Sequence, residues 1–99
     1  MSQDTVHVVA HSRAKPGHEE ALMTLLVENT TTIRQEPGCI RYEVFQNEAN
    51  PGDFVCLEEW ASDTVLDTHR DAPHTRVLHQ ALEPLLAAPM DIRRYRWRA

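Results

Sequence analysis

Residues 34–43 read RQEPGCIRYE, and this stretch decides the fold because it ends a helix and begins a strand. Pro37 cannot continue a helical hydrogen-bond ladder, and Gly38 accepts the left-handed conformation that often caps a helix. Beyond this stop, Ile40, Tyr42 and Val44 occupy alternate positions, which is the period-two pattern of a strand. The stretch therefore predicts a helix that stops sharply and returns as a strand.

A strand and a helix precede this stretch. Residues 6–13 alternate between two faces, and the sequence KPG at 15–17 breaks the strand. From residue 18 to about residue 35, leucines and Ile33 recur at helical spacing. The N-terminal part of the chain is therefore predicted to be one strand followed by one helix.

The chain after residue 43 turns back at once. Residues 47–53 contain Asn-Pro-Gly, which favours a turn, and residues 54–60 form the next strand. Alternate side chains of a strand share a face, so Cys56, Glu58 and Trp60 are expected to point the same way.

A helix in two pieces and a last strand complete the predicted order. Ser62 is a good N-cap for a helix that carries His69, and Pro73 interrupts this helix because it pushes the preceding residue out of helical conformation. A second piece runs from about residue 74 to 86, where Pro84 should bend or fray it. The chain finishes with a strand at about residues 90–97.

This order, β-α-β-β-α-(α)-β, predicts a single domain over residues 1–99 of the α+β class, a ferredoxin-like fold with helices on one face of an antiparallel sheet. The strands carry apolar side chains on both faces. Leaving one such side chain in water, when it could be fully buried, gives up roughly 1.5 to 3 kcal/mol of hydrophobic stabilisation. We expect a second sheet to cover the face that holds Val9, Phe45, Val55, Leu57, Tyr95 and Trp97.

Composition excludes several partners. The net charge of -5 disfavours nucleic acid, and the four arginines at positions 93, 94, 96 and 98 are more simply solvated or paired with acidic groups. No apolar run approaches the roughly 18 to 20 residues that cross a membrane. Met1–Asp4 lacks a secretion signal, so we expect a cytoplasmic protein. Cys39 and Cys56 have no paired spacing and are expected to be reduced.

Several short motifs, taken in order, are similar to one known family. They are Pro-Gly at 16–17, EPGC at 36–39, EEW at 58–60, and His69 followed by Pro-His at 73–74. This ordered set resembles the antibiotic biosynthesis monooxygenase family, which includes quinol monooxygenases. The resemblance implies a dimeric α+β barrel with a pocket between sheet and helices in each subunit. It also implies oxidation of a small aromatic or quinol by dioxygen without flavin, haem or metal, and the chain has no GxGxxG motif.

His69 is the first candidate catalytic residue. A neutral imidazole with an ordinary pKa of about 6.5 can take a phenolic proton at physiological pH. The alternative is a helix histidine that caps a neighbouring carbonyl. Trp60 is expected to supply a flat wall and an indole donor toward an oxyanion, although core packing explains it equally well.

The remaining candidates also have structural alternatives. Glu58 could orient a histidine or bind a substrate hydroxyl, or form an ion pair with Arg34 or Arg41. Tyr42 could hydrogen-bond the substrate or only pack, and His74 could close the pocket mouth or be an exposed helix-start residue.

Two further inferences concern metals and the pocket wall. His7 and His11 lie about 13 Å apart along a strand, and His69 and His74 are five residues apart, which does not align on a straight helix face, so no metal site is expected. In a polyketide-tailoring branch of the family, an asparagine precedes the strand tryptophan by four residues and a tyrosine follows it by six. Cys56 and Leu66 stand there instead and imply a more apolar pocket.

The leading hypothesis is a cytoplasmic homodimer that oxidises a small quinol or hydroxylated aromatic with dioxygen. An isomerase of a small carbonyl metabolite shares the proton abstraction. A non-enzymatic protein that binds a hydrophobic metabolite is the third possibility.

Overall fold

The structure is a computed structural model that describes residues 4–99. The expectation that Met1–Asp4 lacks a secretion signal falls almost wholly outside this range. Within it, none of the helices has the length and apolar character that spanning a membrane requires.

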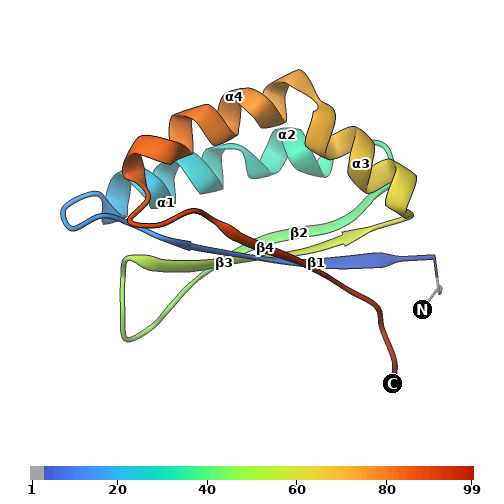
Figure 1. The fold of residues 1–99 in the computed structure, drawn as a ribbon, viewed down its shortest axis with the longest axis horizontal. Helices are drawn as coiled ribbons and strands as arrows, with labels where there is room; N and C mark the ends of the chain where they lie inside the picture. Colours follow the sequence, from blue (N-terminus) through green and yellow to red (C-terminus); the bar gives the residue numbers. More distant parts are fainter. Residues whose placement is uncertain (1–3) are drawn as a thin grey trace.

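Over residues 4–99, four antiparallel strands form one sheet, in the order β2-β3-β1-β4. The helices of this range cover one face of the sheet and leave the other face bare (Figure 1). The α+β ferredoxin-like arrangement is thus confirmed. The strands are β1 (Val6–Arg13), β2 (Cys39–Gln46), β3 (Asp53–Trp60) and β4 (Asp91–Tyr95), and the helices are α1 (Glu19–Glu28), α2 (Thr30–Arg34), α3 (Asp63–Asp71) and α4 (Pro73–Leu82), followed by a 3-10 turn, η1 (Glu83–Leu85).

The first helix differs from its prediction, because residues 18–35 form two helices that meet at Asn29. The Asn29 side chain donates a hydrogen bond of 2.8 Å to the Leu25 carbonyl, which is the acceptor that the Asn29 backbone would use in a continuous helix. The hydroxyl of Thr30 donates to the Val27 carbonyl at 2.8 Å. Two local side-chain bonds therefore compete with the helical ladder at this point.

The second helical region breaks where proline predicts. Ser62 caps α3, with its hydroxyl accepting from the Val65 backbone N–H at 3.2 Å. Ala72 is extended, with φ -62° and ψ 140°, and α4 begins at Pro73 itself, since proline suits the first helical position. The helix ends at Leu82 and tightens into η1, which contains Pro84.

The last strand is shorter than predicted because its partner ends. Tyr95 pairs with His7, one residue from the start of β1 at Val6, so beyond residue 96 β1 has no residue left to pair with the chain in the described range. Three of the four arginines of this region, at positions 93, 94 and 96, pair with acidic groups, as expected. Arg94 contacts Asp63 at 3.1 Å and Asp67 at 2.7 Å, and therefore ties β4 to α3.

The register gives the sheet two different faces. Tyr42 lies opposite Glu58 and Val44 opposite Cys56, so these side chains face the helices together with the buried Val8 of β1. The opposite face carries Val9, Phe45, Val55, Leu57 and Tyr95, as the alternation predicted. In the single chain Phe45 is 45% and Tyr95 48% exposed, so this face keeps apolar side chains in contact with water.

Gly38 fixes how closely the turn after α2 approaches α3. Its φ is +83°, and a Cβ on it would lie 2.5 Å from Cγ1 of Val65. Gly17 has a similar φ of +86°, but a Cβ on it would meet no atom of residues 4–99 within 4 Å beyond its own chain neighbours. The two glycines share the conformational requirement, and only Gly38 adds a steric one.

We expect Gly38→Ala to lower the free energy of unfolding by about 2–4 kcal/mol, as left-handed strain and overpacking combine. Gly17→Ala is the matched control and should cost about 1–2 kcal/mol. Urea unfolding of both variants measures the difference. Equal losses would contradict a close packing of this turn against Val65.

Candidate active site

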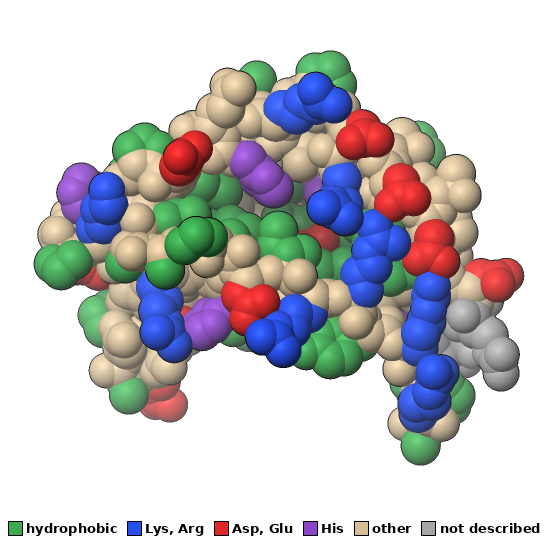
Figure 2. Space-filling view, in the orientation of Figure 1, with side chains coloured by type: hydrophobic (Ala, Val, Ile, Leu, Met, Phe, Trp, Pro, Cys, Tyr) green, Lys and Arg blue, Asp and Glu red, His purple; other side chains and the backbone are tan. Residues whose placement is uncertain are grey.

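A cavity of about 670 Å³ lies between the helix-facing side of the sheet and helices α3 and α4. It appears as a hollow with hydrophobic side chains inside and basic side chains at its edge (Figure 2). Its apolar lining includes Val8, Ala10, Leu66, Leu78, Leu82 and Met90, and its polar lining includes Tyr42, Glu58, His69, Arg70, Thr75 and His79. The size suits a small-molecule ligand.

His69 is held by a carboxylate that comes from the turn after α2. It lies in the last turn of α3, buried, with Nδ1 3.0 Å from Oε1 and 2.9 Å from Oε2 of Glu36. Because a carboxylate only accepts, we assign the proton to Nδ1 and the lone pair to Nε2. Within residues 4–99, no protein group hydrogen-bonds Nε2. His69 thus lines the cavity with the lone pair of Nε2 available to accept a proton.

Trp60 fixes the other side of this imidazole. The two rings stack with centroids 4.3 Å apart and planes at 27°. The indole is completely buried, its Nε1–H donates to Oε1 of Glu58 at 2.9 Å, and it does not line the cavity. Trp60 therefore forms neither the expected flat wall of the cavity nor the expected donor to an oxyanion, because its indole N–H already binds Glu58. The indole lies behind His69 and Glu58 and positions both.

Glu58 is a buried carboxyl without an ion pair among the described residues. Of the two arginines considered as partners, Arg34 donates to the Tyr42 carbonyl at 2.8 Å and Arg41 pairs with Glu43. The expected ion pair with either arginine is thus wrong, because each has another acceptor. Burial raises the pKa of Glu58 to about 7, with a smaller push from the charge of Glu36, while the bond from Trp60 opposes the rise.

The environment moves His69 in the opposite direction. Burial lowers the pKa of His69, and its hydrogen bond to Glu36 opposes that effect. Near neutral pH the cavity therefore holds a neutral imidazole and a carboxyl that is protonated in a large fraction of molecules. The lowered pKa of His69 suits a base, and the raised pKa of Glu58 suits an acid in the same site.

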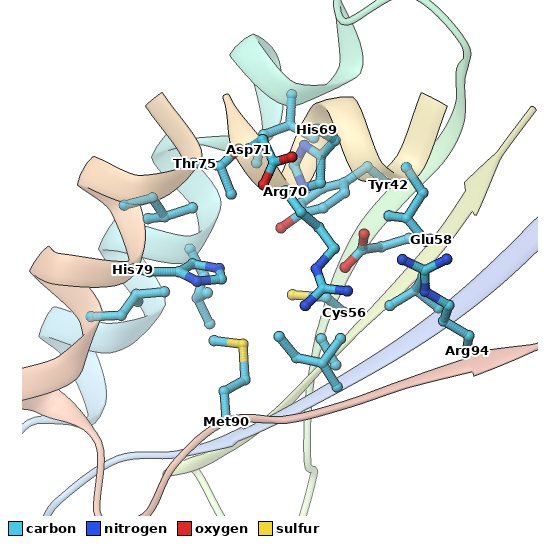
Figure 3. Close-up of a pocket in the computed structure, with 18 of the residues that line it drawn as sticks. Tyr42, Cys56, Glu58, His69, Arg70, Asp71, Thr75, His79, Met90 and Arg94 are labelled. Atoms are coloured by element: carbon cyan, nitrogen blue, oxygen red, sulfur yellow. The ribbon is translucent and has the colours of Figure 1, made fainter. Parts of the chain in front are cut away.

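Three other predicted residues also line the cavity. Tyr42, Cys56 and Leu66 are all buried there, and Figure 3 shows Tyr42 and Glu58 directed into the same space. Burial raises the pKa of Tyr42 strongly and that of Cys56 to about 12, so both stay neutral. Both cysteines are free thiols, as expected.

His74 lies elsewhere than predicted. Its Nε2 is 2.9 Å from Oε2 of Glu36, and the residue does not contribute to the cavity lining. It therefore does not close the pocket mouth in this structure. It is the exposed partner of the carboxylate that holds His69.

The bend at Ala72 brings two histidines to one carboxylate. The exclusion of a metal assumed that residues five apart cannot meet on a straight helix, but the chain leaves helical conformation between His69 and His74. Glu36, His69 and His74 each offer a ligand atom, and these atoms lie within 4.8 Å of one another. These residues could hold a divalent metal ion.

The sequence did not single out Glu36 or Thr75 as site residues. Glu36 stood within the EPGC motif without a role. Thr75 precedes Leu78 and Leu82 at helical spacing, so the apolar stripe of α4 could have placed it on the cavity side. Its hydroxyl is buried without a hydrogen-bond partner among residues 4–99, which makes it a group for a ligand to satisfy.

Comparisons with known proteins agree with this geometry. The sequence profile described as antibiotic biosynthesis monooxygenase matches residues 5–81. The chain is 32% identical over 87 residues to Rv0793 of Mycobacterium tuberculosis, named as a monooxygenase, and the match covers 88% of this chain and 85% of that protein. It is 29% identical over 87 residues to YgiN of Escherichia coli, named as a quinol monooxygenase, with 77% and 83% covered.

Other relatives include a protein named as an isomerase and a protein longer than this chain. An isomerase of (4S)-4-hydroxy-5-phosphonooxypentane-2,3-dione from Salmonella paratyphi B is 31% identical over 70 residues, which cover 71% of this chain and 73% of the isomerase. The chain spans 65% of the length of sll1783 of Synechocystis sp., at 28% identity over 95 residues, or 96% of this chain.

Solved structures share the fold across the chain. A protein from Methanosarcina mazei superimposes with a TM-score of 0.90 at 30% identity, covering 97% of this chain and 95% of that one. Rv0793 itself gives a TM-score of 0.89 at 28% identity, with 96% of each chain covered.

Glu58 should make stability depend on pH. Folding raises its pKa from 4.5 to about 7. Between these pH values the folded state binds more protons than the unfolded state, so the free energy of unfolding falls as the pH rises from 4.5 to about 7. The loss due to Glu58 should reach about 3 kcal/mol. We expect Glu58→Gln to lack this component when urea unfolding is followed at several pH values. Parallel profiles for the two proteins would contradict a buried, unpaired carboxyl.

Proposed function

This chain belongs to the antibiotic biosynthesis monooxygenase family, and we propose that it oxidises a small quinol or hydroxylated aromatic with dioxygen, without a cofactor. One observation carries the proposal. His69 lines the cavity with its tautomer set by Glu36, so that Nε2 is the nitrogen left to accept a proton. The names of relatives support this reaction class.

The base would begin the reaction. A hydroxyl of the bound quinol gives its proton to Nε2 of His69, and the resulting anion is a stronger electron donor to dioxygen. The overall change is quinol plus dioxygen to hydroxyquinone plus water. The substrate supplies all four electrons, two in becoming a quinone and two in the conversion of C–H to C–OH.

The other cavity residues would orient the substrate and stabilise charge. A protonated Glu58 donates a hydrogen bond to a developing oxyanion, and Trp60 keeps this carboxyl in place through its indole N–H. The hydroxyls of Tyr42 and Thr75 offer further hydrogen bonds. Leu66 and Met90 provide apolar walls that fit an aromatic ring.

An isomerase is the second candidate, and two observations favour it. One relative carries the name of an isomerase that acts on a phosphorylated dione. Arg70 lines the cavity, and no ion pair is found for it within residues 4–99, so it could hold an anionic group. Proton abstraction from carbon beside a carbonyl would use the same His69, but it would consume no oxygen.

We further propose that two copies of the chain pair through the bare face of the sheet, in the cytoplasm. The apolar side chains of that face include Phe45, which is nearly half exposed in the single chain. Val9, Val55 and Leu57 surround it on the same face. Their burial against a second sheet would remove them from water.

Oxygen uptake by His69→Ala tests the catalytic proposal. Against a panel of quinols and hydroxylated aromatics, we expect wild-type uptake to fall by about 10²- to 10⁴-fold, the contribution typical of a general base. The dissociation constant for the substrate should change little. His18→Ala, an exposed histidine outside the cavity, is the control. Uptake that survives in His69→Ala would refute the base, and binding without any turnover would favour a binding protein.

Sedimentation tests the pairing of subunits. At micromolar concentration we expect a mass of about twice the 11.4 kDa of one chain. Phe45→Glu should shift the protein toward the monomer, because it places a charge in the apolar interface. Val77→Glu, on an exposed position of α4, is the matched control and should leave the mass unchanged. A wild-type monomer would overturn the paired-sheet proposal.

A further inference from the structure

The six histidines of the chain do not share one kind of environment. On the bare face of the sheet, His7 faces Glu59 at 3.5 Å and His11 faces Asp53, so each carboxylate there serves one imidazole. Glu36 instead serves two, with Nδ1 of His69 and Nε2 of His74 each 2.9 Å from Oε2. The turn after α2 and the two consecutive helices α3 and α4 thus converge on one small volume.

We propose that Glu36, His69 and His74 form a binding site for a divalent transition-metal ion, with Zn²⁺ as the probe that fits them. Two imidazole nitrogens and one carboxylate oxygen are the donor types that zinc accepts, and water can complete a tetrahedron. The three donor atoms already lie within 4.8 Å of one another.

The burial of the three residues suits a metal site with an entry path. The His69 ring is fixed by its stack on Trp60, and Glu36 is mostly covered, so two ligands are already oriented. His74 is exposed and can adjust. In a tetrahedral zinc site with bonds of about 2.0–2.1 Å, donor atoms lie about 3.3 Å apart. Each of the two contacts with Glu36, at 2.9 Å, therefore has to lengthen by only a few tenths of an ångström, and the two imidazole nitrogens already lie within 4.8 Å of each other.

Two of the three ligands, Glu36 and His74, do not line the cavity, whereas His69 does. A bound ion would still act on the cavity through His69. Coordination uses the lone pair of Nδ1, so the proton of a neutral ring must sit on Nε2, whereas the bond to Glu36 places it on Nδ1. The ion would thus change Nε2 from a proton acceptor to a donor. This consequence, unlike the site itself, rests on the proposed role of His69 as a base.

Calorimetric titration of Zn²⁺ into the metal-stripped full chain tests the site. We expect one ion per chain, and a dissociation constant at least tenfold weaker in His74→Ala and in Glu36→Gln. His11→Ala is the matched control, since His11 also contacts a carboxylate but shares it with no second imidazole of the described residues. Co²⁺ added to the wild type should give the absorption bands of a four-coordinate ion, and these should be lost in His74→Ala.

Two results would overturn the site: no zinc binding by the wild type at millimolar concentration, or equal weakening by His74→Ala and His11→Ala. Circular dichroism of each variant separates loss of a ligand from loss of folding. The ¹⁵N shifts of the His69 ring report its tautomer with and without zinc, and they should show the proton moving to Nε2. Because titration and ring shifts need no substrate, zinc binding can be established even if oxygen uptake fails.

Discussion

The hydrogen bond between Glu36 and His69 connects the turn after α2 with the last turn of α3, and the candidate site depends on it. These residues lie 33 positions apart, so the bond forms only when the turn packs closely against α3. Gly38 permits that approach, because its lack of a side chain leaves room for Val65. A backbone requirement at one glycine thereby sets the tautomer of a histidine in another element. The orientation of His69 in the cavity therefore depends on the conformation of the turn that follows α2.

Around this bond, burial and hydrogen bonding divide the ionisable groups of the cavity. Trp60 contacts both His69 and Glu58, by stacking on one and donating to the other. Removal from water disfavours the charged form of each, and this lowers the pKa of the imidazole and raises that of the carboxyl. Burial thus favours a neutral base and a neutral acid, while the indole holds both groups in place and its hydrogen bond partly opposes the rise in the pKa of Glu58. A neutral base beside a neutral acid suits the proton transfer that the proposed quinol oxidation and the alternative carbonyl isomerisation share.

The break between α3 and α4 has a second effect on the same carboxylate. Pro73 starts a new helix after the extended Ala72, and the exposed His74 and the buried, cavity-lining His69 then contact the same carboxylate. A continuous helix would have turned these two imidazoles to different faces. The outer face of the site is therefore open to solvent through His74, whereas its inner face belongs to the cavity. The proposed metal site therefore shares His69 with the cavity, while its other two ligands stay outside the cavity lining.

The sequence by itself determined the element order, the cap at Ser62, the break at Pro73 and the two faces of the sheet, because periodicity and proline chemistry act over a few residues. It also singled out His69, Glu58, Tyr42, Cys56 and Leu66, all of which line the cavity, through strand alternation and the resemblance to a family. Only the tertiary structure assigned Glu36 to His69, put Trp60 behind the imidazole, and left Glu58 without an arginine. These outcomes depend on which side chains meet when segments far apart in the sequence pack together. Local pattern carries no record of that packing, and the hydrogen bond that spans residues 36 and 69 exists only in the folded chain.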